Sequence, residues 1–207
     1  FAYTCNKLYK KPERAYAIMY ENYRRIAFYT RDESRKKDYY NKSIDYGILA
    51  KNTSPKTSNY NNLAYSYYFA KEYSLAKNYF EKALRTETFK WTALCGLAKV
   101  NIKENNWAQA EILYNQTLNV IKEELNKPWD KNAMSFLHYN CAFCQLISNT
   151  GEKACKDSLE RAFKFNRAQG IIMSHKIDME NMKGEEKINQ SLLDKCLMLI
   201  DTYLKVK

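Results

Sequence analysis

The sequence predicts an all-α fold built from antiparallel pairs of helices. Residues 57–90 and 91–124 repeat each other at a spacing of 34 residues, which indicates a repeated structural unit. The 207-residue chain contains 5 Gly and 3 Pro, too few for the many tight turns of a β-rich fold. Hydrophobic residues make up 45% of the chain, so its helices can bury a core.

The two copies place similar side chains at equivalent positions. Small residues let two helices cross closely, and aromatic residues fill the space between one helix pair and the next. The matched positions are Leu63 and Leu97, Ala64 and Ala98, Tyr73 and Trp107, Ala76 and Ala110, Phe80 and Tyr114, and Leu84 and Leu118.

This pattern resembles the tetratricopeptide repeat, a 34-residue helix-turn-helix unit with a signature of large, Leu, small and aromatic residues followed by Ala, aromatic, Ala and Pro. Both copies depart from the signature at its last position, where Thr88 and Lys122 replace Pro. The resemblance implies a right-handed superhelical solenoid of antiparallel helix pairs, ending in a C-terminal capping helix.

Residues 13–51, before the tandem copies, are expected to form an atypical helix pair. Pro12 suits the first turn of a helix, and either Asp32 or Ser34 can cap the helix that follows. Arg24 stands near a position that the repeat reserves for a small residue. We therefore expect a pair that resembles the repeat without its small residues.

A third repeat is expected over residues 136–169, and a capping region over 170–207. The second helix of the preceding copy is expected to continue to Leu125, before Pro128 stops it. A final amphipathic helix is expected over 185–207, because its apolar residues recur at helical spacing. We expect the whole chain to form a single domain, residues 1–207, within a longer protein.

The formal net charge is +11, and basic residues exceed acidic ones most strongly in the first 56 residues. Such an excess suits an acidic protein, nucleic acid or an anionic membrane surface. Acidic residues are interleaved with the basic ones, so a solvated lysine-rich face is the simpler interpretation.

Five of the six cysteines fall at apolar positions within helical patterns, where a reduced Cys packs as a small hydrophobe. A reducing, cytoplasmic location is therefore predicted, although nothing in the sequence excludes a disulfide or an extracellular domain. No apolar run reaches 18 residues, and no membrane span is predicted.

Neither a metal, a cofactor nor an enzymatic activity is predicted. His138, Cys141 and Cys144 share one side of a helix, but a structural zinc site needs a fourth ligand and usually presents CxxC from a turn. We expect packed core thiols there. The chain has only two histidines and no recognisable catalytic motif.

In the tetratricopeptide family, the first helix of each pair lines a concave groove. Amides can bind a peptide backbone, aromatic rings an apolar anchor, and basic residues an acidic one. The groove residues that the resemblance implies are Arg25, Tyr29, Asn61, Tyr65, Tyr68, Phe69, Lys99, Lys103 and Asn140, with Glu21 and Phe28 as further contributions from the atypical pair.

Chaperone-binding members of the family clamp a terminal carboxylate with Lys followed by Asn in the first helix. The equivalent pairs here include Asn61 with Tyr65 and Cys95 with Lys99, so the clamp is not reproduced. We predict a protein- or peptide-binding scaffold whose partner is an extended segment with acidic and aromatic residues. The alternatives are a nucleic-acid-binding helical-repeat domain and a regulatory sensor that binds a signal peptide or small ligand.

Overall fold

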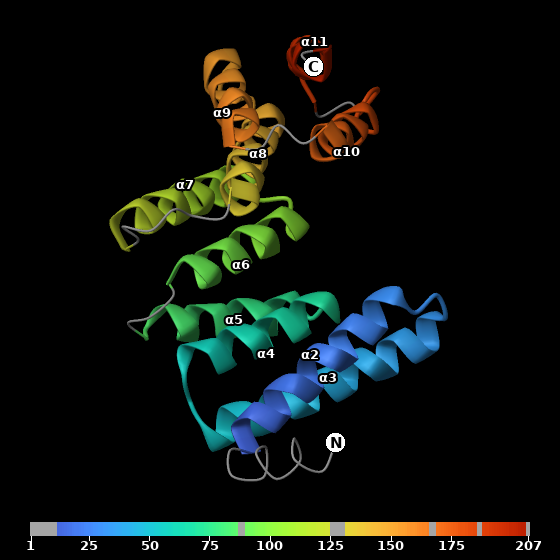
Figure 1. Cartoon of the computed structure of the whole chain (residues 1–207), viewed down its shortest axis with the longest axis vertical. Helices are drawn as coiled ribbons and strands as arrows, with labels where there is room; N and C mark the ends of the chain where they lie inside the picture. The colour runs from blue at the N-terminus through green and yellow to red at the C-terminus, as the bar shows by residue number, and fades with distance from the viewer. Residues whose placement is uncertain (1–11, 87–89, 125–130, 166–168, 186–187, 206–207) are drawn as a thin grey trace. The chain divides into compact units, whose positions relative to one another are not determined.

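The computed structural model describes residues 12–86, 90–124, 131–165, 169–185 and 188–205, and all regular structure within these ranges is helical (Figure 1). The predicted all-α class is therefore confirmed. The helices are α2 (Pro12–Tyr29), α3 (Glu33–Thr53), α4 (Thr57–Phe69), α5 (Tyr73–Leu84), α6 (Lys90–Lys103), α7 (Trp107–Glu124), α8 (Lys131–Ser148), α9 (Glu152–Phe165), α10 (Gln169–Glu180) and α11 (Gln190–Lys205).

The chain divides into two compact units, Phe1–Lys103 and Glu104–Lys207. Unit 1 contains α2 to α6, and unit 2 contains α7 to α11. The boundary falls between the two helices of the second 34-residue copy. The tandem repeat thus contributes helices to both units.

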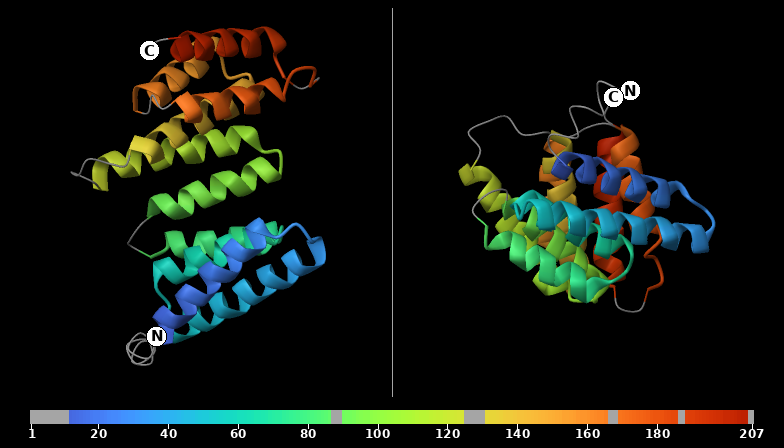
Figure 2. Two further views of the ribbon diagram at one scale, coloured as in Figure 1. Left: turned by 45° about the vertical axis from the view of Figure 1, so that its right-hand side comes forward. Right: turned by 90° about the horizontal axis from the view of Figure 1, so that it is seen from below.

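Consecutive helices pack against each other throughout unit 1 (Figure 2). The first helix of the regular pair, α4, also contacts α2 and α6, so the helices expected to line the groove are neighbours. Ala64 of α4 and Ala76 of α5 are fully buried, as predicted for positions where paired helices cross closely.

Gly96 of α6 shows how closely the helices of unit 1 approach. A Cβ atom at this position would lie 2.2 Å from Cε1 of Phe80, a fully buried ring on α5. Only hydrogen at position 96 leaves room for this ring. The close contact between α5 and α6 therefore depends on one glycine.

Polar contacts join the atypical pair to the regular one. The Ser43 hydroxyl of α3 lies 3.0 Å from the carbonyl oxygen of Tyr20 in α2 and 2.8 Å from the Ser66 hydroxyl in α4. Both serines are fully buried. Since buried hydroxyls need partners, this contact fixes three helices relative to one another.

A side-chain cap starts α3, and left-handed residues follow α4 and α6. The Asp32 carboxylate accepts a hydrogen bond from the backbone N–H of Arg35 at 2.9 Å, so Asp32 caps α3 as one of the two predicted alternatives. Lys71 and Asn105, which stand two residues after the ends of α4 and α6, have left-handed φ angles of 66° and 59°. Asn105 stands 34 positions after Lys71, so the backbone repeats with the sequence.

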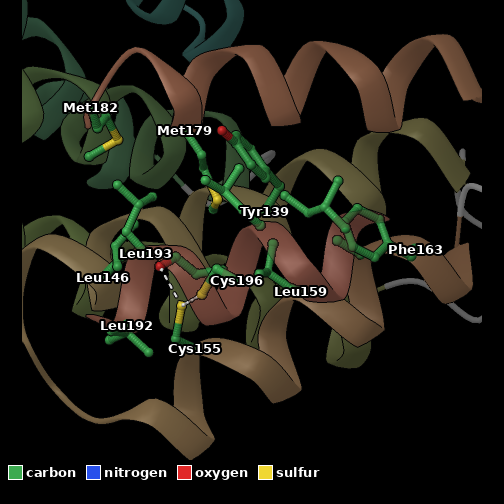
Figure 3. Close-up of a cluster of buried hydrophobic side chains, with 14 of the residues drawn as sticks. Tyr139, Leu146, Cys155, Leu159, Phe163, Met179, Met182, Leu192, Leu193 and Cys196 are labelled. Carbon is green, nitrogen blue, oxygen red and sulfur yellow. Dashed lines mark hydrogen bonds between the residues drawn. The ribbon is translucent and has the colours of Figure 1, made fainter. Parts of the chain in front are cut away.

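In unit 2, α8 packs against both α7 and α9, while α11 packs against α9 and α10. Figure 3 shows the core to which α8, α9, α10 and α11 contribute, which includes Leu146, Leu159, Phe163 and Leu193. The opposite side of α11 is solvated, and Met198 there is 71% exposed. A helix with one buried and one solvated face suits the predicted capping role.

The last helix begins later than the sequence predicts. It starts at Gln190 instead of Glu185, because the side-chain oxygen of Asn189 accepts a hydrogen bond from the backbone N–H of Leu192 at 3.0 Å. Asn189 thereby acts as a helix cap. The predicted continuation of α7 to Leu125 lies outside the described residues.

Candidate binding site

Unit 1 contains a cavity of about 380 Å³ beside α2, α4 and α6. Three cationic and four aromatic side chains line it, and no carboxylate is among these lining residues. They are Arg24, Arg25, Phe28, Tyr29, Tyr65, Phe69 and Lys99, which together are called the cationic aromatic pocket below.

Contacts with residues outside the pocket lining fix two of its aromatic rings. Tyr65 meets Phe80 edge-on, with ring centroids 4.9 Å apart, and its hydroxyl donates to the carbonyl oxygen of Thr92 at 3.4 Å. Phe69 stacks on Tyr40 at an interplanar angle of 9°. Burial raises the pKa of Tyr65, so this phenol stays protonated. The pocket therefore has a preformed aromatic wall.

The other two rings are exposed at the end of α2. Phe28 is 64% and Tyr29 78% accessible to solvent, and the rings meet edge-on at 5.2 Å. Large adjacent aromatic side chains in water are typical of surfaces that bind a partner.

The cationic groups lie over aromatic rings. The Lys99 ammonium is 5.5 Å from the centroid of Tyr65, and the Arg24 guanidinium is 5.5 Å from that of Phe69. Arg24 also forms an ion pair with Glu21, which does not line the pocket. Cation–π contacts hold such charges near an apolar surface. The pocket can thus offer positive charge and apolar area to the same ligand group.

Five of the nine predicted groove residues line this pocket. These are Arg25, Tyr29, Tyr65, Phe69 and Lys99. Phe28, expected from the atypical pair, joins them. Arg24 was not predicted as a groove residue, because it stands near a position where helices of the repeat cross. The four-residue spacing from Arg24 to Phe28, which puts both on one helix face, is the signal that could have found it.

The remaining four predicted residues lie elsewhere. Asn61 is buried and donates to the Thr92 hydroxyl at 2.6 Å, so this amide joins α4 to α6. Tyr68 packs against Tyr73 and Phe69, and Lys103 is exposed, both outside the pocket lining.

Asn140, the fourth of these residues, belongs to unit 2. Its amide nitrogen donates to the carbonyl oxygen of Phe136 at 2.7 Å, and its amide oxygen lies 3.5 Å from the Tyr114 hydroxyl. The first contact lies within α8, and the second joins α7 to α8.

His138, Cys141 and Cys144, the motif considered above as a metal site, are buried in unit 2. Cys141 and Cys144 are buried, and burial raises the pKa of the Cys144 thiol to about 12. The His138 ring stacks on Phe165 at 5.5 Å. Within the described residues, no group of three or more His, Cys, Asp or Glu side chains is arranged to bind a metal ion. The described helices also include none that is long and apolar enough to cross a bilayer.

No family model matches the chain. A curated relative is the uncharacterized protein ycf37 of Porphyra purpurea, which is 34% identical over 96 residues. The match covers 42% of this chain and 56% of the relative, so the chain spans about half the length of the curated relative it matches.

Two solved structures are similar along most of the chain. BtubC (BKLC) from P. vanneervenii has a TM-score of 0.60 and 14% identity, covering 94% of this chain and 90% of its own. YrrB, a TPR protein with an unusual peptide-binding site, has a TM-score of 0.47 and 17% identity, covering 98% and 97% respectively.

The similarity to BtubC concerns the fold alone. Within each unit, consecutive helices pack against each other, and a 34-residue period appears in both the side chains and the left-handed backbone positions. Fully buried alanines occupy the four small-residue positions of the two copies. The chain therefore has an all-α, tetratricopeptide-like helical-repeat fold.

Proposed function

We propose that this chain is a protein-binding scaffold, and that α2, α4 and α6 of unit 1 bind an extended segment of its partner. The observation that carries the proposal is the cationic aromatic pocket. It combines a rigid aromatic wall with three cations and lies beside the first helices of consecutive pairs. Preformed pockets with an aromatic wall are where binding energy concentrates in protein interfaces.

The lining of the pocket favours a partner segment with aromatic and acidic residues. An aromatic side chain of the partner would pack against Tyr65 and Phe69, while a neighbouring carboxylate would meet Arg25 and Lys99. A basic partner would bring its charge beside three cations with no lining carboxylate to compensate. The pocket therefore discriminates by charge as well as by shape.

Selection of linear peptides on the intact chain tests this proposal. A display library of random peptides should yield binders in which an aromatic residue stands beside Asp or Glu. The double variant Arg25→Ala/Tyr29→Ala should weaken their affinity roughly tenfold or more, since each side chain contributes about 1 kcal/mol or more at such a site. Both residues are exposed, so the variant should keep its fold, which circular dichroism checks.

The matched control is Tyr68→Phe/Lys103→Ala. These two residues were also implied by the family resemblance, yet they do not line the pocket. The control variant should bind the selected peptides as the wild type does. Equal binding by Arg25→Ala/Tyr29→Ala and the wild type would place the binding surface elsewhere and refute the proposal.

Nucleic acid is the second candidate ligand, favoured by the net charge of +11 and by cations lying beside aromatic rings. A fluorescent single-stranded RNA measures this candidate. Its affinity should fall steeply between about 50 and 200 mM salt, whereas a peptide held mainly by the aromatic wall should lose much less. RNA binding that exceeds peptide binding at physiological salt, and that depends on Arg25 and Tyr29, would favour the second candidate.

A further inference from the structure

Two buried cysteine thiols touch each other in the core of unit 2. The sulfur atoms of Cys155 in α9 and Cys196 in α11 lie 3.3 Å apart, although 41 positions separate the residues in the chain (Figure 3). The Cys155 sulfur also lies 3.4 Å from the carbonyl oxygen of Ala142 in α8. Both cysteines are fully buried among apolar side chains.

The geometry brings this pair close to a covalent bond. A disulfide has a sulfur–sulfur distance of about 2.05 Å, so the two atoms need to approach by about 1.2 Å. Small rotations about the two side chains supply such a movement. A disulfide here would add a covalent link between two helices that packing contacts and the exposed ion pair of Lys195 with Glu152 already join.

We propose that Cys155 and Cys196 form a redox-responsive site, at which oxidation joins them in a disulfide that fastens α11 to α9. The inference concerns unit 2 and is independent of the proposed binding function of unit 1. A disulfide would explain why cysteine, and not another small apolar residue, stands at both positions.

Hydrogen peroxide is the oxidant that drives this reaction. One thiolate sulfur attacks a peroxide oxygen and breaks the O–O bond, leaving a sulfenic acid, while the released hydroxide takes the thiol proton and forms water. The second sulfur then attacks the sulfenic sulfur and displaces hydroxide, which leaves as a second water with the remaining thiol proton. Two thiols are oxidised, and one peroxide is reduced to two waters.

Burial makes this reaction depend on motion of the last described helix. Neither thiol is accessible to solvent, so peroxide cannot reach either sulfur in the closed fold. The contact between the two sulfurs raises the pKa of Cys155 and lowers the pKa of Cys196. Partial opening of α11 exposes both sulfurs to peroxide, because local unfolding of a helix brings its buried face into water. The site therefore responds to sustained oxidation, and the disulfide then prevents the opening that allowed it to form.

Peptide mapping of the intact chain tests the pairing. The protein is incubated with hydrogen peroxide, unfolded in the presence of a thiol-blocking reagent, and digested for mass spectrometry. We expect a linked pair of peptides containing Cys155 and Cys196, lost again on reduction. The thermal unfolding midpoint should rise by roughly 10 °C, since the bond closes a loop of about 40 residues in a unit of about 100.

Cys155→Ala is the informative variant, and Cys144→Ala is its matched control, because both cysteines are fully buried in the same unit. Peroxide should raise the unfolding midpoint of the wild type and of Cys144→Ala, but not that of Cys155→Ala. If Cys155→Ala does not fold, the peptide map of the wild type decides alone. A map in which either cysteine is oxidised singly, or linked to another cysteine, overturns the proposal, as does a wild type whose pair stays reduced.

Discussion

His175 is a buried histidine of α10 whose two ring nitrogens have no hydrogen-bond partner within the described part of the chain. Its ring lies face to face with Tyr139 of α8, with centroids 3.6 Å apart and an interplanar angle of 10°. Burial lowers the pKa of the imidazole from 6.5 to about 4, because the charged form loses its hydration. The folded protein therefore holds this ring neutral at pH 7.

Acid should destabilise unit 2 through this histidine. In the unfolded chain the imidazole takes up a proton near pH 6.5, whereas in the fold it does so only near pH 4. The stability contributed by the neutral ring is complete above about pH 6.5 and is lost as the pH falls towards 4. We expect a loss of about 1–2 kcal/mol between pH 7.5 and pH 5 from this group.

Urea unfolding at the two pH values measures this loss, with His175→Phe as the comparison. The phenyl ring can keep the stack on Tyr139 and cannot be protonated. The variant should lose less stability on acidification than the wild type does. Equal losses in the two proteins would show that His175 is not responsible for the acid response.

At the scale of helix packing, Gly96 should be the least replaceable glycine of unit 1. Gly96→Ala would place a methyl group 2.2 Å from the Phe80 ring, and we expect a loss of about 1–3 kcal/mol in the free energy of unfolding as α5 and α6 separate. Denaturant unfolding measures the change.

Gly47→Ala in α3 is the matched control. The added Cβ would lie 3.0 Å from Cδ1 of Leu63, a terminal methyl group that needs to shift by only a few tenths of an ångström. Alanine also favours a helix over glycine by about 1 kcal/mol, so this variant should be close to neutral. If Gly47→Ala and Gly96→Ala lower the free energy of unfolding equally, the contact of Gly96 with Phe80 has no special role.

The turn after α4 should gain stability from a glycine. Lys71 has a φ angle of 66°, a conformation that costs a residue with a Cβ about 1–2 kcal/mol, and glycine adopts it freely. Lys71→Gly should therefore stabilise the protein by about 0.5–1 kcal/mol after the greater flexibility of unfolded glycine is included.

Asn105→Gly provides the comparison at the equivalent turn of the second copy. Asparagine tolerates the left-handed conformation better than lysine does, so its gain should be smaller. Thermal or denaturant unfolding of both variants shows which substitution gains more stability. A larger gain at position 105 than at 71 would show that the lysine is not strained.

For the molecule as a whole, the sequence predicts the helix pairs better than it predicts their surfaces. The 34-residue period and the small residues at Ala64 and Ala76 identify paired helices, because close crossing leaves little choice of side chain. The cap at Asp32 was also predictable, since it depends on local chemistry. The start of α11 was not, because several polar residues before Gln190 could cap a helix.

The composition of the pocket could be predicted only in part. The repeat register of a family identifies which positions along a helix face the groove. It selected Tyr65, Phe69 and Lys99, which all line one cavity. It does not identify the rotation of the helix or the partner of a polar group. Asn61 is directed to Thr92 by the approach of α4 to α6, a contact that no pattern in one helix reveals. The division between α6 and α7 was also not predicted, since the repeat has the same spacing on both sides of it.

The buried contact of Ser43 with Ser66 and Tyr20 separates the attachment of α2 from the residues that α2 contributes to the cationic aromatic pocket. It holds α2 from its inner side, whereas Arg25 and Tyr29 project from the exposed part of the same helix and have no part in that contact. Mutations on the outer side of α2 can therefore accumulate without weakening its attachment. A lineage that keeps the two serines can therefore change the lining of the cationic aromatic pocket at little cost in stability.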